Sequence, residues 1–281
     1  MIKSILVGLD SSENQTIVRK YAVEIAKFLK AKVNGVHVID IRKLYSPFVE
    51  DIFYSAGMAS VPDLQNLVKN RLEKVSEVLK EGYQAALEEH EVEGEFFSKQ
   101  GNVSEEIANQ AKSHDLLVIG TKGEHTSISE ILLGSTFSEL ILGVNKPVIV
   151  VPEQCKKFYI KKILVAYDGS TNSNQALEII TQSVKDHQFE LEILVVENSN
   201  IEDAQSALQE AECYLKNHEV KYNCRIVKGP ACSCILEHAK ATKCDMIAIG
   251  SYSSSAIKDF FIGSVARELL EETTLPMLLA N

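Results

Sequence analysis

A glycine-rich segment near the middle of the chain is its clearest candidate for chemistry. Gly120 and Gly123 follow a short apolar run, and ten residues later the segment closes with Gly134-Ser135-Thr136. Glycine permits positive φ and lets backbone approach an anion closely. A helix opening at Gly134 would aim its free N–H groups at the same place, where they favour phosphate. The spacing predicts a phosphate cradle, with a plain tight turn as the alternative because isolated glycine patterns are weak signals.

The elements that must position this cradle occur twice. Residues 2–12 match residues 160–170 at an offset of 158, and residues 115–120 match residues 245–250 at an offset of 130. One domain has been duplicated, and the first copy is longer by 158 − 130 = 28 residues. We place the surplus in an insertion at about 42–70, which we expect to be a loop with a short helix. Its aromatic residues favour a lid or a dimer contact, with a specific ligand role as the alternative.

Each copy alternates short apolar runs with helically spaced ones, which predicts a parallel sheet covered on both faces. The fold class is therefore α/β, with two Rossmann-like domains, each a five-stranded parallel sheet flanked by helices. A chain of 281 residues with 45% apolar content can bury two such cores. The expected strands are 5–9, 33–39, 95–99, 116–119 and 148–151, then 163–167, 190–196, 221–227, 246–249 and 277–279. Asn102 or Ser104 is placed to cap the helix between the third and fourth strands.

Composition removes several classes of function. The balance of 29 basic against 39 acidic residues gives a net charge of −10 without a basic block, so we expect no nucleic-acid partner. No apolar run reaches the roughly 18 residues that span a bilayer, and no secretory leader is recognisable. Six unevenly placed cysteines do not form a secreted disulfide framework, which favours the cytoplasm.

An acidic residue follows the first strand of each copy. Asp10 and Asp168 stand where ligands bind in open parallel sheets, at the carboxyl ends of strands. Aspartate is also common there as a turn former or helix cap. Both interpretations stay open from the sequence. Lys122 and His125 lie on the glycine segment and are either phosphate contacts or merely solvated.

These motifs together resemble the universal stress protein family over nearly the whole chain, twice. The resemblance rests on Asp10-Ser11-Ser12, on the segment 37–40 and on the run from Glu130 to Ser135. It implies that ATP is bound, with ADP or AMP as alternatives and with or without Mg. In ATP-binding members the acid and a valine hold the adenosine part, and the glycines hold ribose and phosphates. By position these residues are Asp10, Val38, Gly120, Gly123, Gly134, Ser135 and Thr136.

The second copy departs from this pattern at one glycine. Its equivalent residues are Asp168, Val196, Gly250, Ser253, Gly263 and Ser264. A Cβ at Ser253 could collide with ligand or oppose the required φ, at a cost on the order of 1 kcal/mol or more. The first copy has ten residues between Gly123 and Gly134, one more than the family's usual nine. We expect firm binding in the first copy and weak or no binding in the second.

A cysteine-rich stretch in the second copy raises a metal or redox site as an alternative. Its candidate ligands are Cys224, Cys232, Cys234 and Cys244. The spacing lacks the paired Cys-x2-Cys knuckles of structural zinc sites, and buried reduced cysteine is an ordinary small apolar residue. We therefore assign no metal.

No catalytic motif is present. The sequence has no Gly-x-Ser-x-Gly elbow, no Gly-x4-Gly-Lys-Ser/Thr phosphate loop and no His-Glu-x2-His helix. We therefore expect that the protein is not an enzyme, or at most hydrolyses ATP slowly. An adenylate-forming enzyme would need a different first-strand motif. The resemblance implies a cytoplasmic, nucleotide-dependent regulator of the stress response with an unidentified protein partner. The alternative is a scaffold or dimerisation protein of the same fold that binds no nucleotide.

The expected division is a first domain at 1–152, a linker at 153–159 and a second domain, with a degenerate nucleotide loop, at 160–281. The resemblance also implies that the last strands of the two domains pair. That would make a pseudo-dimer within one chain, which could dimerise again.

Overall fold

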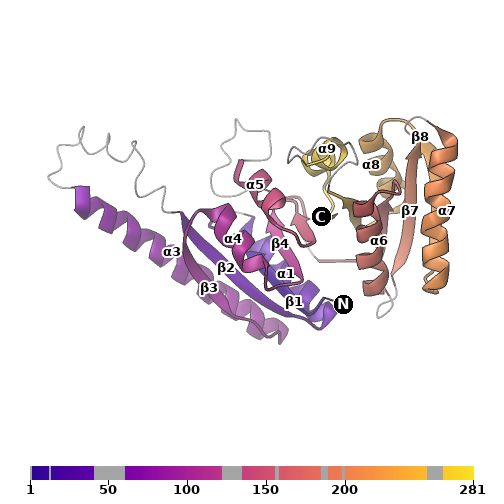
Figure 1. The fold of residues 1–281 in the computed structure, drawn as a ribbon. Helices are drawn as coiled ribbons and strands as arrows, with labels where there is room; N and C mark the ends of the chain where they lie inside the picture. Colours follow the sequence, from indigo (N-terminus) through magenta and orange to yellow (C-terminus); the bar gives the residue numbers. More distant parts are fainter. Residues whose placement is uncertain are drawn as a thin grey trace.

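Strands and helices alternate through two successive halves of the chain (Figure 1). The computed structural model describes residues 2–12, 14–40, 61–121, 135–155, 158–184, 189–197, 200–251 and 262–281. The first half contains β1 (Ser4–Gly8), α1 (Gln15–Leu29), β2 (Lys32–Asp40), α3 (Val61–His90), β3 (Phe96–Gly101), α4 (Val103–Ala111), β4 (Leu116–Gly120), α5 (Ser135–Gly143) and β5 (Val148–Val151). The second contains β6 (Lys162–Ala166), α6 (Thr171–Val184), β7 (Glu190–Glu197), α7 (Ile201–Asn217), β8 (Tyr222–Lys228), α8 (Ala231–Thr242), β9 (Met246–Gly250), α9 (Ser264–Glu272) and β10 (Met277–Ala280).

The two sets of five strands join in one ten-stranded sheet. Its order is β3-β2-β1-β4-β5-β10-β9-β6-β7-β8. Within each half the strands pair in parallel, as the sequence predicts, and the halves meet where β5 pairs antiparallel with β10. Ile149 lies opposite Leu278 at this seam. The expected pairing of the last strands within one chain is therefore present.

Helices cover both faces of the sheet, as the apolar strands require. One core lies under α1, α3, α6 and α7 and contains Ile5, Tyr83, Leu177 and Ala211. The other lies under α4, α5, α8 and α9 and contains Leu6, Ile141, Ile235 and Leu269. Adjacent strand residues such as Ile5 and Leu6 belong to different cores because side chains alternate across a strand. This three-layer arrangement leaves the ends of the strands free to form a site.

The first copy's surplus residues include part of a long helix. α3 has 30 residues, whereas its counterpart α7 has 17. Leu79, Tyr83 and Leu87 are buried at a spacing of four, which seats the second half of α3 on the sheet. α3 begins at Val61, so residues 61–70, which the sequence places both at the end of the insertion and in a helical run over 62–90, are helical. The short helix expected within the insertion lies outside the described residues.

Asn102 is the cap of α4. Its Oδ1 accepts hydrogen bonds from the N–H of Ser104 (3.0 Å) and of Glu105 (3.5 Å). These bonds satisfy backbone donors that the first helical turn leaves without partners. Of the two candidates from the sequence, Asn102 caps the helix and Ser104 does not.

Candidate functional site

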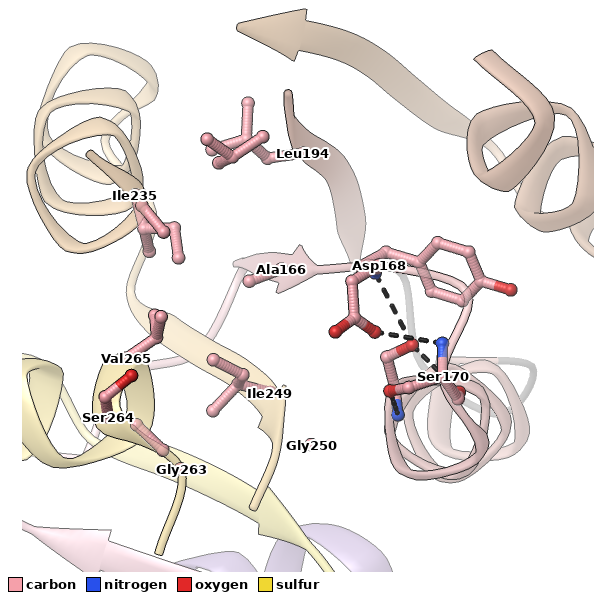
Figure 2. A pocket seen from close by; sticks show the side chains of 15 residues that line it. Ala166, Asp168, Ser170, Leu194, Ile235, Ile249, Gly250, Gly263, Ser264 and Val265 are labelled. Atoms are coloured by element: carbon pink, nitrogen blue, oxygen red, sulfur yellow. Dashed lines mark hydrogen bonds between the residues drawn. The ribbon is translucent and has the colours of Figure 1, made fainter. Parts of the chain in front are cut away.

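A pocket opens at the carboxyl ends of the strands in the second half, where ligands bind in parallel α/β sheets (Figure 2). Five of the six predicted positions of the second copy line it. They are Asp168, Val196, Gly250, Gly263 and Ser264. Asp168 follows β6, Val196 lies in β7, and Gly250 ends β9. The sixth position, Ser253, lies outside the described residues.

The pocket's inner wall is apolar. Ala166, Leu194 and Ile249 come from three strands, and Ile235 and Ala266 come from α8 and α9. Figure 2 shows Leu194, Ile235 and Ile249 surrounding one hollow, with Asp168 on its other side. An apolar wall beside a few placed polar groups is the usual composition of a small-molecule site. The arrangement can accept a flat, largely apolar group such as a nucleobase.

Asp168 organises the turn between β6 and α6. Its Oδ1 accepts a hydrogen bond from the Ser170 N–H (2.9 Å), and Gly169 between them has φ +78°. Ser173 Oγ donates to the Ser170 carbonyl (3.0 Å) and accepts from the Asp168 N–H (3.5 Å). The turn-forming interpretation of this aspartate is therefore correct. It does not exclude a ligand contact, because each carboxylate oxygen can accept more than one hydrogen bond.

Gly250 lines the pocket and is also required by packing against α6. A Cβ built on it would lie 2.8 Å from Asn172 Cβ and 2.8 Å from the Ser173 backbone nitrogen, both in the first turn of α6. Real Cβ atoms do not approach other heavy atoms so closely. The ligand contact that the resemblance implies for this glycine stays a prediction, and its lack of a side chain also lets α6 lie against β9.

The start of α9 supplies the pocket's backbone donors. The Gly263 carbonyl accepts from the Arg267 N–H (2.9 Å), and the Gly263 N–H donates to the Ser251 carbonyl (2.9 Å). The N–H groups of residues 264–266 have no partner within the helix by α-helical geometry. The helix dipole makes this end attractive to an anion. Ser264 is exposed at the rim.

Tyr167 borders the same pocket in its neutral form. Burial, and then the nearby Glu210 carboxylate, raise the pKa of its hydroxyl well above the ordinary value. The hydroxyl donates to Asn174 Oδ1 (2.6 Å), and Asn174 Nδ2 donates to Glu210 Oε1 (3.3 Å). These hydrogen bonds hold Tyr167 in place at one side of the pocket, and none of the three side chains in the chain of bonds is positively charged.

The first half places its described site residues in the same way. Asp10 follows β1, Val38 lies near the end of β2, and Gly120 ends β4. Asp10 Oδ1 accepts from the Ser12 N–H (2.9 Å) and hydroxyl (2.5 Å), so it forms the same kind of turn as Asp168. Ser135 and Thr136 are the first residues of α5. Gly123, Gly134, Lys122 and His125 lie outside the described residues.

Several pocket residues were not identified from the sequence. Ser170, Ser173, Leu194 and Ile235 line the pocket but belong to no glycine motif. Ser170 and Ser173 could have been found from the turn that Asp168 predicts, because an Asp turn places the next few residues beside it. Leu194 and Ile235 carry no signal that separates a pocket wall from an ordinary core.

The cysteines do not assemble a metal centre. Among the described residues, no group of three or more His, Cys, Asp or Glu side chains is placed to hold a metal ion. All six cysteines are outside disulfides, and Cys232 and Cys244 are buried. Burial raises the pKa of Cys232 to about 11. The alternative of a metal site therefore gains no support.

None of the described helices is both long and apolar enough to cross a membrane.

Comparisons with known proteins agree on one family. The model of the universal stress protein family matches residues 1–152 and 195–281. Universal stress protein Slr1230 of Synechocystis is 25% identical over 290 residues, which cover 99% of each chain. Universal stress protein MJ0577 of Methanocaldococcus jannaschii is 34% identical over 156 residues, 54% of this chain and 95% of that protein. A universal stress protein of Archaeoglobus fulgidus has the same fold, with a TM-score of 0.73, 21% identity and coverage of 99% and 96% of the two chains.

Proposed function

Because the chain belongs to the universal stress protein family, we propose that it binds ATP in its first half and acts as a nucleotide-dependent regulator of the stress response. The observation that carries this proposal is the pocket of the second half. It gathers Asp168, Val196 and Gly250 at the strand ends, and these positions recur in the first half as Asp10, Val38 and Gly120. The first half also keeps Gly123, which the second half replaces with Ser253.

The residues present suit an adenine nucleotide. The apolar wall suits the base, the aspartate accepts hydrogen bonds from hydroxyl or amino groups, and the helix N-terminus favours phosphate. In the first half, Asp10 and Val38 would hold the adenosine part, and Gly120 with the start of α5 would hold the ribose and phosphates. ADP or AMP fit the same chemistry. Mg would bind through the phosphates rather than through a dedicated protein cage.

The second half would bind nucleotide weakly or not at all. Its pocket has the apolar wall, but Ser253 replaces a loop glycine. We propose further that residues 1–152 and 160–281 are the two domains, joined by the linker 153–159. The protein would act in the cytoplasm through a protein partner, could form homodimers, and would at most hydrolyse ATP slowly.

A scaffold that binds no nucleotide is the second candidate. The observation favouring it is that the packing of α6 against β9 already accounts for a glycine at position 250, without any ligand. In that case the pairing of β5 with β10 would serve the scaffold function, and the strand-end sites would bind no nucleotide.

Nucleotide extraction and titration separate the two candidates. Denaturing the purified protein and identifying released nucleotides by mass spectrometry should yield an adenine nucleotide, and calorimetry with added ATP should show binding. Gly123→Val should abolish binding because a β-branched side chain opposes positive φ and close ligand approach. Gly143→Ala is the matched control, since its Cβ would make only an ordinary 3.7 Å contact with Ala108 Cβ. Folded protein that neither releases nor binds nucleotide would be a scaffold.

A further inference from the structure

We infer that Gln15 contacts the ligand of the first half's site, donating a hydrogen bond from its side-chain amide to an acceptor atom on the adenosine part. The inference rests on the proposed function and adds a residue that the glycine motif does not contain. Gln15 is the first residue of α1, five positions after Asp10.

The repeat places Gln15 at the pocket. Gln15 corresponds to Ser173 at the same offset of 158 that relates Asp10 to Asp168. The strand pairings keep this register, since Ser4 lies opposite Lys32 in the first half and Lys162 lies opposite Glu190 in the second. Ser173 lines the second pocket. By this correspondence Gln15 stands in the first half where Ser173 stands at the second pocket, and it has a longer side chain.

The side-chain amide of Gln15 is a buried donor without an acceptor. The residue is only 7% exposed, and its Nε2 has no hydrogen-bond partner in the described part of the chain. The great majority of buried polar groups are paired, because an unpaired one retains the cost of desolvation. An unpaired donor at a pocket position indicates a group that pairs with a ligand.

The two halves differ at this point in a way that matters for binding. Ser173 Oγ is already used, since it donates to the Ser170 carbonyl and accepts from the Asp168 N–H. Within the described part of the turn, Gln15 donates from its backbone N–H to the Ser12 carbonyl (3.1 Å), and its side-chain Nε2 is not used. The first half thus has a spare donor where the second half has a satisfied hydroxyl.

The donor of Gln15 complements the acceptor of Asp10. Both residues flank one turn, in which the Asp10 carboxylate accepts from Ser12. A carboxylate acceptor and an amide donor five positions apart on this turn suit a ligand group that carries both a donor and an acceptor. The ribose hydroxyls and the amino-and-ring-nitrogen edge of adenine both have this character. Phosphate oxygens only accept, so they do not satisfy the pair.

Two substitutions test the inference. Gln15→Met keeps the volume and removes the amide, and Gln15→Ser installs the residue of the second half. Both should weaken ATP binding in calorimetry by about 3- to 10-fold, the loss of one hydrogen bond. Gln15→Met should at the same time raise the melting temperature without nucleotide, because it removes an unpaired buried amide. A residue with a purely structural role would not shift the two quantities in opposite directions.

Gln175→Met is the matched control. Gln175 Oε1 is also buried without a partner among the described residues, but Gln175 does not line the described pocket. Its substitution should raise the melting temperature and leave ATP affinity unchanged. Wild-type affinity in both Gln15 variants would overturn the inference and leave the proposed function standing. If the wild type itself binds no ATP, both are wrong.

Discussion

Asp115 joins the start of β1 to the start of β4 through Ser4. Its Oδ2 accepts from the Ser4 N–H (3.0 Å) and hydroxyl (2.9 Å), and from the Lys3 N–H (2.9 Å). Asp245 makes the equivalent bonds to the N–H groups of Lys161 and Lys162, both at 2.9 Å. These aspartates lie at the amino ends of the strands, away from the pocket, so we assign them to stability.

Asp115→Asn should lower the free energy of unfolding by about 1–2 kcal/mol at pH 7, because hydrogen bonds to a charged acceptor are lost. Burial acts to raise the pKa of Asp115, but the bonds from Lys3 and Ser4 outweigh it and hold the pKa below its usual value. The stabilisation is therefore complete above the ordinary carboxyl pKa and is lost as pH falls through the lowered one. Urea denaturation at several pH values measures this. Asp203→Asn, at the start of α7, is the control and should cost less than about 0.5 kcal/mol. If the difference in the free energy of unfolding between the wild type and Asp115→Asn stayed constant down to pH 2, the assignment would be contradicted.

Gly250→Ala should destabilise the protein by about 1–3 kcal/mol, because the new methyl would displace the first turn of α6. Gly143→Ala, at the end of α5, should be neutral or slightly stabilising because alanine favours helix. Thermal unfolding without nucleotide compares them. Equal melting temperatures for the two variants would show that the packing of α6 does not require a glycine at position 250.

Glu212→Gln should make Cys224 more reactive. Cys224 is exposed, but partial desolvation of its thiol, then the hydrogen bond that it donates to Glu212 Oε1 (2.8 Å), raise the pKa of the thiol to about 11. The thiol is therefore protonated at pH 8, and the thiolate is the reactive form. Removing the carboxylate charge lowers the pKa and increases the thiolate fraction. Iodoacetamide labelling followed by peptide mass spectrometry measures the rate at each cysteine, with buried Cys232 as an internal reference. An unchanged rate at Cys224 would mean that Glu212 does not control it.

Phe158→Ala should weaken the attachment between the two halves. The ring centroid of Phe158 lies 5.1 Å from that of Tyr21 and 6.0 Å from that of Phe28, both in α1. The ring centroids of Phe28 and of Phe189, at the approach to β7, are 5.1 Å apart. Because Phe158 is half-buried, we expect a loss of about 2 kcal/mol in the free energy of unfolding. Tyr159→Ala removes an exposed ring that has Lys161 above it at 5.5 Å and should cost less than about 1 kcal/mol. If the costs are reversed, the aromatic cluster does not hold the halves together.

The sequence predicts the strands well because their apolar runs are short, buried and repeated. The two copies constrain each other, so the strand ends shift by only one or two residues, and Asn102 is identified as a cap by its own chemistry. The strand-end position of Asp168 follows from the general rule for parallel sheets, whereas Val196 follows only from the resemblance to the family.

Other features depend on distances that a pattern does not contain. Gly250 looks like a phosphate-binding glycine, yet its lack of Cβ makes room for Asn172. Gln15 looks like an ordinary first residue of an amphipathic helix, and only burial without a partner marks it. Ile235 of α8 has the spacing of a core residue but also lines the pocket.

The pairing of β5 with β10 inside one chain has an evolutionary consequence. When two identical subunits meet about a two-fold axis, every substitution appears on both sides of the contact at once. A covalent tether removes that constraint and also fixes the effective concentration of the two partners, so dilution does not separate them. Each half is then free to change alone, which is how Gln15 in one copy and Ser173 in the other can stand at corresponding positions of the repeat.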